Sequence, residues 1–179
     1  MAMATATKKW TLEELHSLPD DGNKYELVRG ELFVTPPPTY YHETISAKLT
    51  RILDPYVAKH GLGYVYHPRA VMRFGGSEVE PDLMVRQPPS DAKADWDSAP
   101  LPTLIVEILS DSTRRRDQNQ KRELYLEAGV AEYWMVDPER RTITVVRKDE
   151  PDVVAADTLV WSPPGTRESL TLHLLLLFS

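Results

Sequence analysis

The sequence comprises 179 residues, of which 41% are hydrophobic and 27% charged, as is ordinary for a globular protein of one domain. It contains no cysteine, which excludes disulfides, thiolate catalysis and cysteine-ligated zinc. Its net charge of −6 lacks the basic excess of strong non-specific nucleic-acid binders, so any nucleic-acid role must depend on a local positive patch.

The first residues, MAMATATKKW, lack the apolar run of a signal peptide. The most apolar stretch, 170–178, is about half the length that spans a bilayer, and His173 interrupts it. We therefore expect a cytoplasmic protein that is not membrane-bound, with 170–178 forming a buried terminal segment.

The N-terminal part of the chain predicts a short helix and a β-hairpin. Thr11 and Glu14 form a capping-box pattern that begins a helix over 12–18. Alternating segments then predict two strands, at 25–28 and 31–34, with Arg29-Gly30 at the turn.

The period changes at Tyr40. Apolar residues at three- and four-residue spacing, from His42 to Tyr56, indicate a helix that ends before Gly61. A second helix is expected over 117–128, and a long surface loop over 86–102. Further strands are expected at 64–66, 70–74, 82–85, 104–109, 133–136 and 142–146. These elements predict an α/β fold with a mixed sheet, in which residues 1–179 form a single domain and 1–10 are disordered.

Glu107 lies within a run of branched apolar residues that predicts a strand buried on both faces. An isolated buried carboxylate is costly, so Glu107 must be paired, protonated or bound to a cation. A salt bridge to a basic residue and a role as metal ligand or general base both satisfy this requirement.

Two further residues break the local pattern. Asp82 follows Pro81 at the start of a strand, where aspartate commonly marks a turn. Lys121 lies on the inward stripe of its helix, where it either snorkels along its aliphatic stem or directs its ammonium at the carboxylates of the neighbouring strand. Asp117, four residues earlier, is placed to hold it.

Asp82, Glu107 and Lys121 together form a set suited to phosphodiester hydrolysis. Two carboxylates suit Mg²⁺ or Mn²⁺, which prefer oxygen ligands. A nearby lysine can stabilise developing charge or orient the attacking water.

Four stretches of the sequence resemble the Uma family of predicted restriction endonucleases, formerly a domain of unknown function. They are Tyr25–Leu32, Glu80–Asp82, Val106–Thr113 and Gly129–Pro138. The resemblance extends from Thr11 to Phe178.

The resemblance implies the PD-(D/E)XK fold, a restriction endonuclease-like core of mixed sheet and flanking helices, here with an N-terminal helix and β-hairpin. Pro81-Asp82 matches the PD element, and Glu107 matches the (D/E) position. Leu109 stands where the motif has lysine, and in this family the lysine has moved to the following helix, where Lys121 lies.

The resemblance also implies a Mg²⁺-dependent DNA endonuclease. Asp82, Glu107 and the backbone carbonyl of Ile108 would hold Mg²⁺ or Mn²⁺. Lys121 would position the water or stabilise the phosphate.

Four residues are candidates for substrate contact. His42 lies at the start of the first long helix, where it either contacts the site or a phosphate, or packs as a core residue. The basic run Arg114, Arg115 and Arg116 is either a solvated helix entrance or a patch that binds the DNA backbone.

A non-catalytic module that binds nucleic acid or protein and retains the nuclease fold is the alternative, which the acidic balance favours. A homodimer suits either function, because cutting both DNA strands needs two sites.

Overall fold

The computed structural model describes residues 8–91 and 93–179. The disorder expected for 1–10 therefore lies mostly outside the described residues. Trp10 is among the described residues, and its backbone N–H donates a hydrogen bond to the carbonyl of Gly30 at 2.9 Å.

The helices and strands follow the expected order. The first half holds α1 (Leu12–His16), β1 (Lys24–Val28), β2 (Glu31–Thr35), α2 (Tyr40–Lys59), β3 (Tyr64–Tyr66), β4 (Met72–Phe74), β5 (Ser77–Val79) and β6 (Leu83–Arg86). The second half holds η1 (Trp96–Ser98), β7 (Leu104–Ile108), α3 (Arg114–Arg116), η2 (Asp117–Lys121), α4 (Arg122–Ala128), β8 (Glu132–Asp137), β9 (Thr142–Val146), β10 (Val153–Ala155), β11 (Thr158–Trp161), β12 (Leu170–His173) and α5 (Leu174–Leu177).

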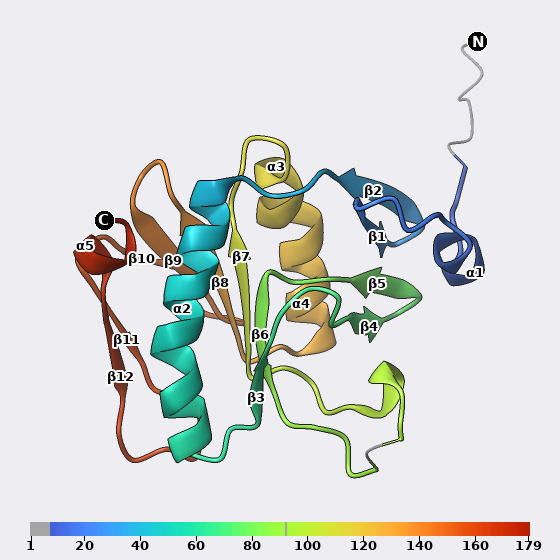
Figure 1. Cartoon of the computed structure of the whole chain (residues 1–179). Helices are drawn as coiled ribbons and strands as arrows, with labels where there is room; N and C mark the ends of the chain where they lie inside the picture. The colour runs from blue at the N-terminus through green and yellow to red at the C-terminus, as the bar shows by residue number, and fades with distance from the viewer. Residues whose placement is uncertain (1–7, 92) are drawn as a thin grey trace.

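Six strands form the central sheet, in the order β10-β9-β8-β7-β6-β3 (Figure 1). Strands β7 and β8 are parallel, whereas the other neighbouring pairs are antiparallel. A second sheet has the order β2-β1-β5-β4, and β11 pairs with β12. The predicted α/β fold with a mixed sheet is confirmed.

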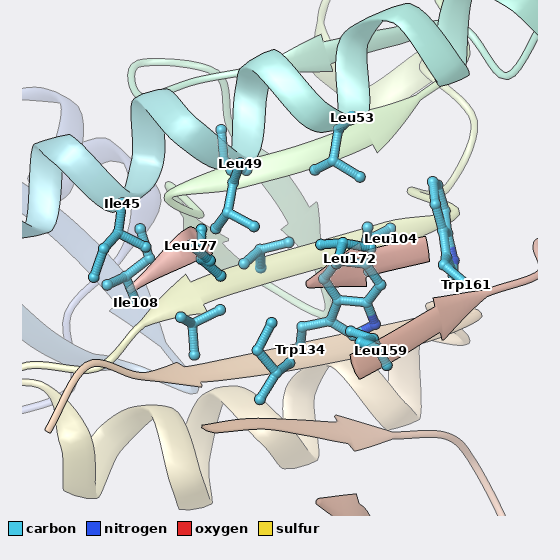
Figure 2. Packing of buried hydrophobic residues seen from close by; sticks show 14 of the residues in the cluster. Ile45, Leu49, Leu53, Leu104, Ile108, Trp134, Leu159, Trp161, Leu172 and Leu177 are labelled. Atoms are coloured by element: carbon cyan, nitrogen blue, oxygen red, sulfur yellow. The ribbon is translucent and has the colours of Figure 1, made fainter. Parts of the chain in front are cut away.

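Helix α2 covers one face of the central sheet. Its apolar stripe, Ile45, Leu49 and Leu53, is fully buried and points at Leu104 and Ile108 of β7 (Figure 2). Burying one such side chain contributes roughly 1.5–3 kcal/mol. This packing fixes the start of α2 beside the end of β7.

The opposite face is covered by α3, η2 and α4, which form one helix over 114–128 (Figure 1). Its buried residues Leu124, Tyr125 and Ala128 confirm the predicted inward stripe. The π-helical turn η2 widens the helix at Asp117–Lys121. Such wide turns are frequent at functional sites.

The hairpin of β1 and β2 turns through Arg29 and Gly30, whose φ angles are 51° and 83°. Two central residues with positive φ make the twist of the turn match that of the strands. Gly30 tolerates this conformation because it lacks a Cβ. Strand β1 of this hairpin belongs to the second sheet and lies beside the helix over 114–128.

Two expectations need correction. Strands β5, β10 and β11, each of three or four residues, were not predicted. The apolar stretch 170–178 forms β12 and α5 and is only partly buried, since Leu175 and Leu176 are exposed.

The long loop over 86–102 is fastened to the core. The Arg86 guanidinium donates to the carbonyls of Trp96, Ala99 and Pro100, at 3.1, 2.6 and 2.5 Å.

None of the helices in the described ranges is long and apolar enough to cross a membrane.

Candidate active site

A cavity of about 450 Å³ opens where the start of α2, the end of β7 and the edge of the second sheet meet. Asp82, Glu107 and Ile108 line it, as do Lys24 and His42. In Figure 1, the start of α2 and the end of β7 lie at the same end of the central sheet. The structure therefore brings together residues that are separated by up to about eighty positions.

Asp82 lies directly before β6 and is held by three donors. Its Oδ2 accepts the backbone N–H of Ile108 at 2.8 Å and lies 3.1 Å from His42 Nε2. Its Oδ1 lies 3.3 Å from Lys24 Nζ. Burial alone would raise the pKa of Asp82, but Lys24, His42 and the Ile108 N–H outweigh it and lower that pKa well below its usual range. Asp82 is therefore ionised at neutral pH.

Glu107 shows how a carboxylate is accommodated in a buried strand. Its Oε1 forms a salt bridge with Lys121 Nζ at 2.5 Å and accepts a hydrogen bond from the Tyr125 hydroxyl at 2.6 Å. Burial raises its pKa to about 7, against the attraction of Lys121 and with help from the nearby charge of Asp82. The salt bridge, one of the two alternatives for this buried glutamate, is present, and Glu107 also lines the cavity.

Lys121 is fully buried, and its ammonium is shared among three carboxylates. Besides Glu107, it lies 2.8 Å from Glu26 Oε1 and 3.9 Å from Asp117 Oδ1. Of the two alternatives for Lys121, the ammonium directed at the carboxylates is the one that these distances match, and Asp117 lies nearby. Lys121 is not among the residues that line the cavity, and its contact with water or phosphate stays a prediction.

Glu26 is a site residue that sequence reasoning missed. It is fully buried on β1, where its Oε1 accepts the backbone N–H of Glu80 at 2.9 Å and its Oε2 lies 3.2 Å from Arg116. Opposing cations lower its pKa to about 2 in spite of burial. Lys24 and Glu26 alternate with apolar residues, a pattern typical of a solvent face. Only the packing of β1 against the helix over 114–128 turns that face inward.

The candidates for substrate contact separate into two groups. His42 and Arg116 line the cavity. Burial lowers the pKa of His42, but its contact with Asp82 outweighs this and raises it. Arg114 is paired with Asp137 at 2.5 Å and Glu139 at 2.9 Å, and Arg115 is exposed outside the cavity lining. The three arginines therefore do not form one patch.

The donor set fits a hard divalent cation. The salt bridge and the hydrogen bond of Glu107 both use Oε1, which leaves Oε2 without a hydrogen bond among the described residues, and Glu107 lines the cavity. Because the N–H and C=O of a strand residue point to the same edge, the Ile108 carbonyl faces Asp82 as its N–H does. Mg²⁺ binds through one or two carboxylates and keeps several waters. Asp82, Glu107 and Ile108 therefore offer enough oxygen ligands.

An unsatisfied oxygen on the cavity wall points the same way. Glu80 Oε2 is buried without a hydrogen-bond partner among the described residues, and such an atom calls for a cation or an ordered water. Asp117 Oδ1 also lacks a hydrogen bond, but it already lies 3.6 Å from Arg116 Nε and 3.9 Å from Lys121 Nζ. Across the described ranges, no three His, Cys, Asp or Glu side chains form a ready-made metal cluster. A metal site here would thus rely on two carboxylates, a carbonyl and water.

Comparisons with known proteins identify a family and a similar fold. The model of the Uma2 family, described as "Putative restriction endonuclease", matches residues 12–175. A similar solved structure is that of "a putative nuclease belonging to DUF820" from Anabaena variabilis, which is 23% identical with a TM-score of 0.79. The match covers 94% of this chain and 97% of that chain. No curated protein matches.

Proposed function

The chain belongs to the Uma2 family, as the four resembling stretches predict, and we propose that it is a metal-dependent nuclease that hydrolyses phosphodiester bonds in DNA. The observation that carries this proposal is the meeting of Asp82 and Glu107 in one cavity, beside the backbone of Ile108. This order of residues fits a PD-(D/E)XK site without its usual lysine at position 109.

Asp82, Glu107 Oε2 and the Ile108 carbonyl would hold Mg²⁺ or Mn²⁺. Such an ion, when bound, polarises the scissile phosphate and lowers the pKa of a water molecule. Lys24 and His42 keep Asp82 ionised and oriented. Lys121 and Tyr125 hold Glu107 through Oε1, which would leave Oε2 for the ion. Lys121 is thus a positioning residue.

The substrate would enter past His42 and Arg116, the two predicted contact residues on the cavity wall. A homodimer would supply two such cavities for the two strands of a duplex. We retain residues 1–179 as one domain and a cytoplasmic location as predictions.

The rival proposal is a module that binds nucleic acid or protein without turnover. Two observations favour it: Lys121 already neutralises Glu107, and the net charge is −6. In that case the carboxylates and lysines would form a closed, structural network.

Calorimetric titration of Mn²⁺ tests the proposal. We expect saturable binding to the wild type and its loss in Glu107→Ala and Asp82→Ala. The matched control is Glu168→Ala, which removes an exposed carboxylate paired with Lys59 and so should bind Mn²⁺ like the wild type.

A cleavage assay completes the test. Supercoiled and linear DNA should be cut in Mn²⁺ or Mg²⁺, and excess chelator should stop the reaction. Cleavage that persists in chelator would refute the metal-dependent mechanism. Absence of both Mn²⁺ binding and cleavage in the wild type would favour the module without turnover.

A further inference from the structure

Two lysines contact the carboxylates of the site, and only one of them lines the cavity. Lys121 is fully buried behind Glu107, whereas the Lys24 side chain is 17% exposed and lines the cavity. Lys121, the lysine that the family resemblance assigns to the site, therefore has no exposed surface, whereas Lys24 has some.

Lys24 occupies its place because of the strand that carries it. Residues 24 and 26 of β1 share a face, since side chains alternate along a strand. Glu26 turns toward Lys121 at 2.8 Å, and Lys24 reaches past it to Asp82 at 3.3 Å. The Lys24 ammonium also donates to the carbonyl of Glu80 at 3.0 Å. These contacts anchor it at the cavity wall.

The ammonium retains capacity for a further partner. Lysine has three N–H donors, and the two contacts of Lys24 within the described chain use two of them. The remaining donor belongs to a partly exposed group at the wall of a cavity that also holds His42. Lysine binds phosphate as a compact point charge, so an anionic oxygen beside Asp82 is the partner that this geometry suits.

We propose that Lys24 contacts the phosphate of the substrate beside Asp82, and thereby supplies the positive charge that the motif lysine provides elsewhere. This inference depends on the proposed function for its substrate, a nucleic-acid strand, and adds the residue that binds its phosphate. Leu109, at the usual position of that lysine, is buried in the apolar cluster with Leu124 and Tyr125.

A merely structural Lys24 would act differently, because it would only neutralise Asp82. The test therefore compares Asp82→Asn with Asp82→Asn/Lys24→Met. Both variants lack the Lys24–Asp82 ion pair, so neither leaves that carboxylate buried without its cation. The probe is a fluorescein-labelled DNA oligonucleotide in EDTA, followed by fluorescence anisotropy at several salt concentrations.

We expect the Lys24→Met change to weaken binding about tenfold near 0.1 M salt, and to reduce the slope of log affinity against log salt by about 0.7–0.9, the effect of one phosphate contact. Asp82→Asn/Lys24→Arg should keep the slope. Lys59→Met removes an exposed lysine outside the cavity lining and should bind like the wild type.

Equal binding by Asp82→Asn and Asp82→Asn/Lys24→Met would overturn the inference, and so would a wild type without saturable binding. Cleavage in Mn²⁺ is scored separately. If the protein cleaves DNA but its affinity for DNA does not depend on Lys24, this inference is refuted and the proposed function is not. Lys24-dependent binding without any cleavage supports the phosphate contact and refutes the proposed function.

Discussion

Replacing Lys121 with methionine is the sharpest test of the buried network. The ammonium of Lys121 contacts Glu26 at 2.8 Å and Glu107 at 2.5 Å, with all three side chains at most 2% exposed. Methionine fills most of the volume but leaves Glu107 with only the Tyr125 hydroxyl. Removing one partner of a buried ion pair typically costs about 3–5 kcal/mol.

The pH dependence of that loss identifies its cause. A carboxyl group whose folded pKa exceeds its unfolded value binds more protons when folded, so stability falls as pH rises between the two values, by up to about 1.4 kcal/mol per pH unit. In the wild type this window runs from the ordinary value of 4.5 to about 7 for Glu107. Without Lys121 the folded pKa rises further, so the window extends above pH 7.

We therefore expect Lys121→Met to lose about 3–5 kcal/mol of unfolding free energy at pH 8.5, and less at pH 6.5. The melting temperature should fall by roughly 6–20 °C. Urea denaturation at both pH values measures the loss. Lys59→Met, which breaks a pair whose side chains are 62% and 63% exposed, should lose at most about 1 kcal/mol. A loss below about 1 kcal/mol for Lys121→Met, or equal losses at both pH values, would refute the reasoning.

Two further predictions concern the metal site and the backbone. Because Glu107 has a pKa of about 7 and must be ionised to bind a cation, Mn²⁺ affinity measured by calorimetry should fall about tenfold from pH 8 to pH 6, and a flat profile would contradict this. Gly63→Ala should cost at least about 2 kcal/mol in urea denaturation, because φ is +99° and a Cβ would lie 2.1 Å from the Arg86 carbonyl oxygen. Gly61→Ala, with φ of +62° and nothing within 4 Å, is the control, and an equal loss in both variants would show that the contact with Arg86 is unimportant.

Long, strongly periodic segments were predictable from the sequence. The stripe from His42 to Tyr56 gave α2, and the apolar run at 104–108 gave a strand buried on both faces. These patterns depend on the local repeat of a helix or strand, so neighbouring residues suffice to recognise them. Short strands such as β5, which pairs with its neighbour β4 and with the distant β1, contain too few residues to show a pattern and escaped prediction.

Part of the candidate site was predictable for a different reason. Glu107 and Lys121 are polar residues in apolar patterns, and such exceptions call for a partner. Glu26 and Lys24 carried no such signal, because charged residues that alternate with apolar ones look like an exposed strand face. Arg116 looked like one of three equivalent arginines, yet it alone lines the cavity.

The sequence by itself determined which elements form and which carboxylates must find a partner, because both follow from local periodicity and the cost of burying charge. Tertiary structure alone decided which partner each carboxylate found. Because β1 packs against the helix over 114–128, Lys24 and Glu26 point inward. Lys121 therefore forms salt bridges with Glu107 and Glu26, and Lys24 lies at the cavity wall beside Asp82. The distances between side chains on separate elements depend on how those elements pack, and no local pattern records them.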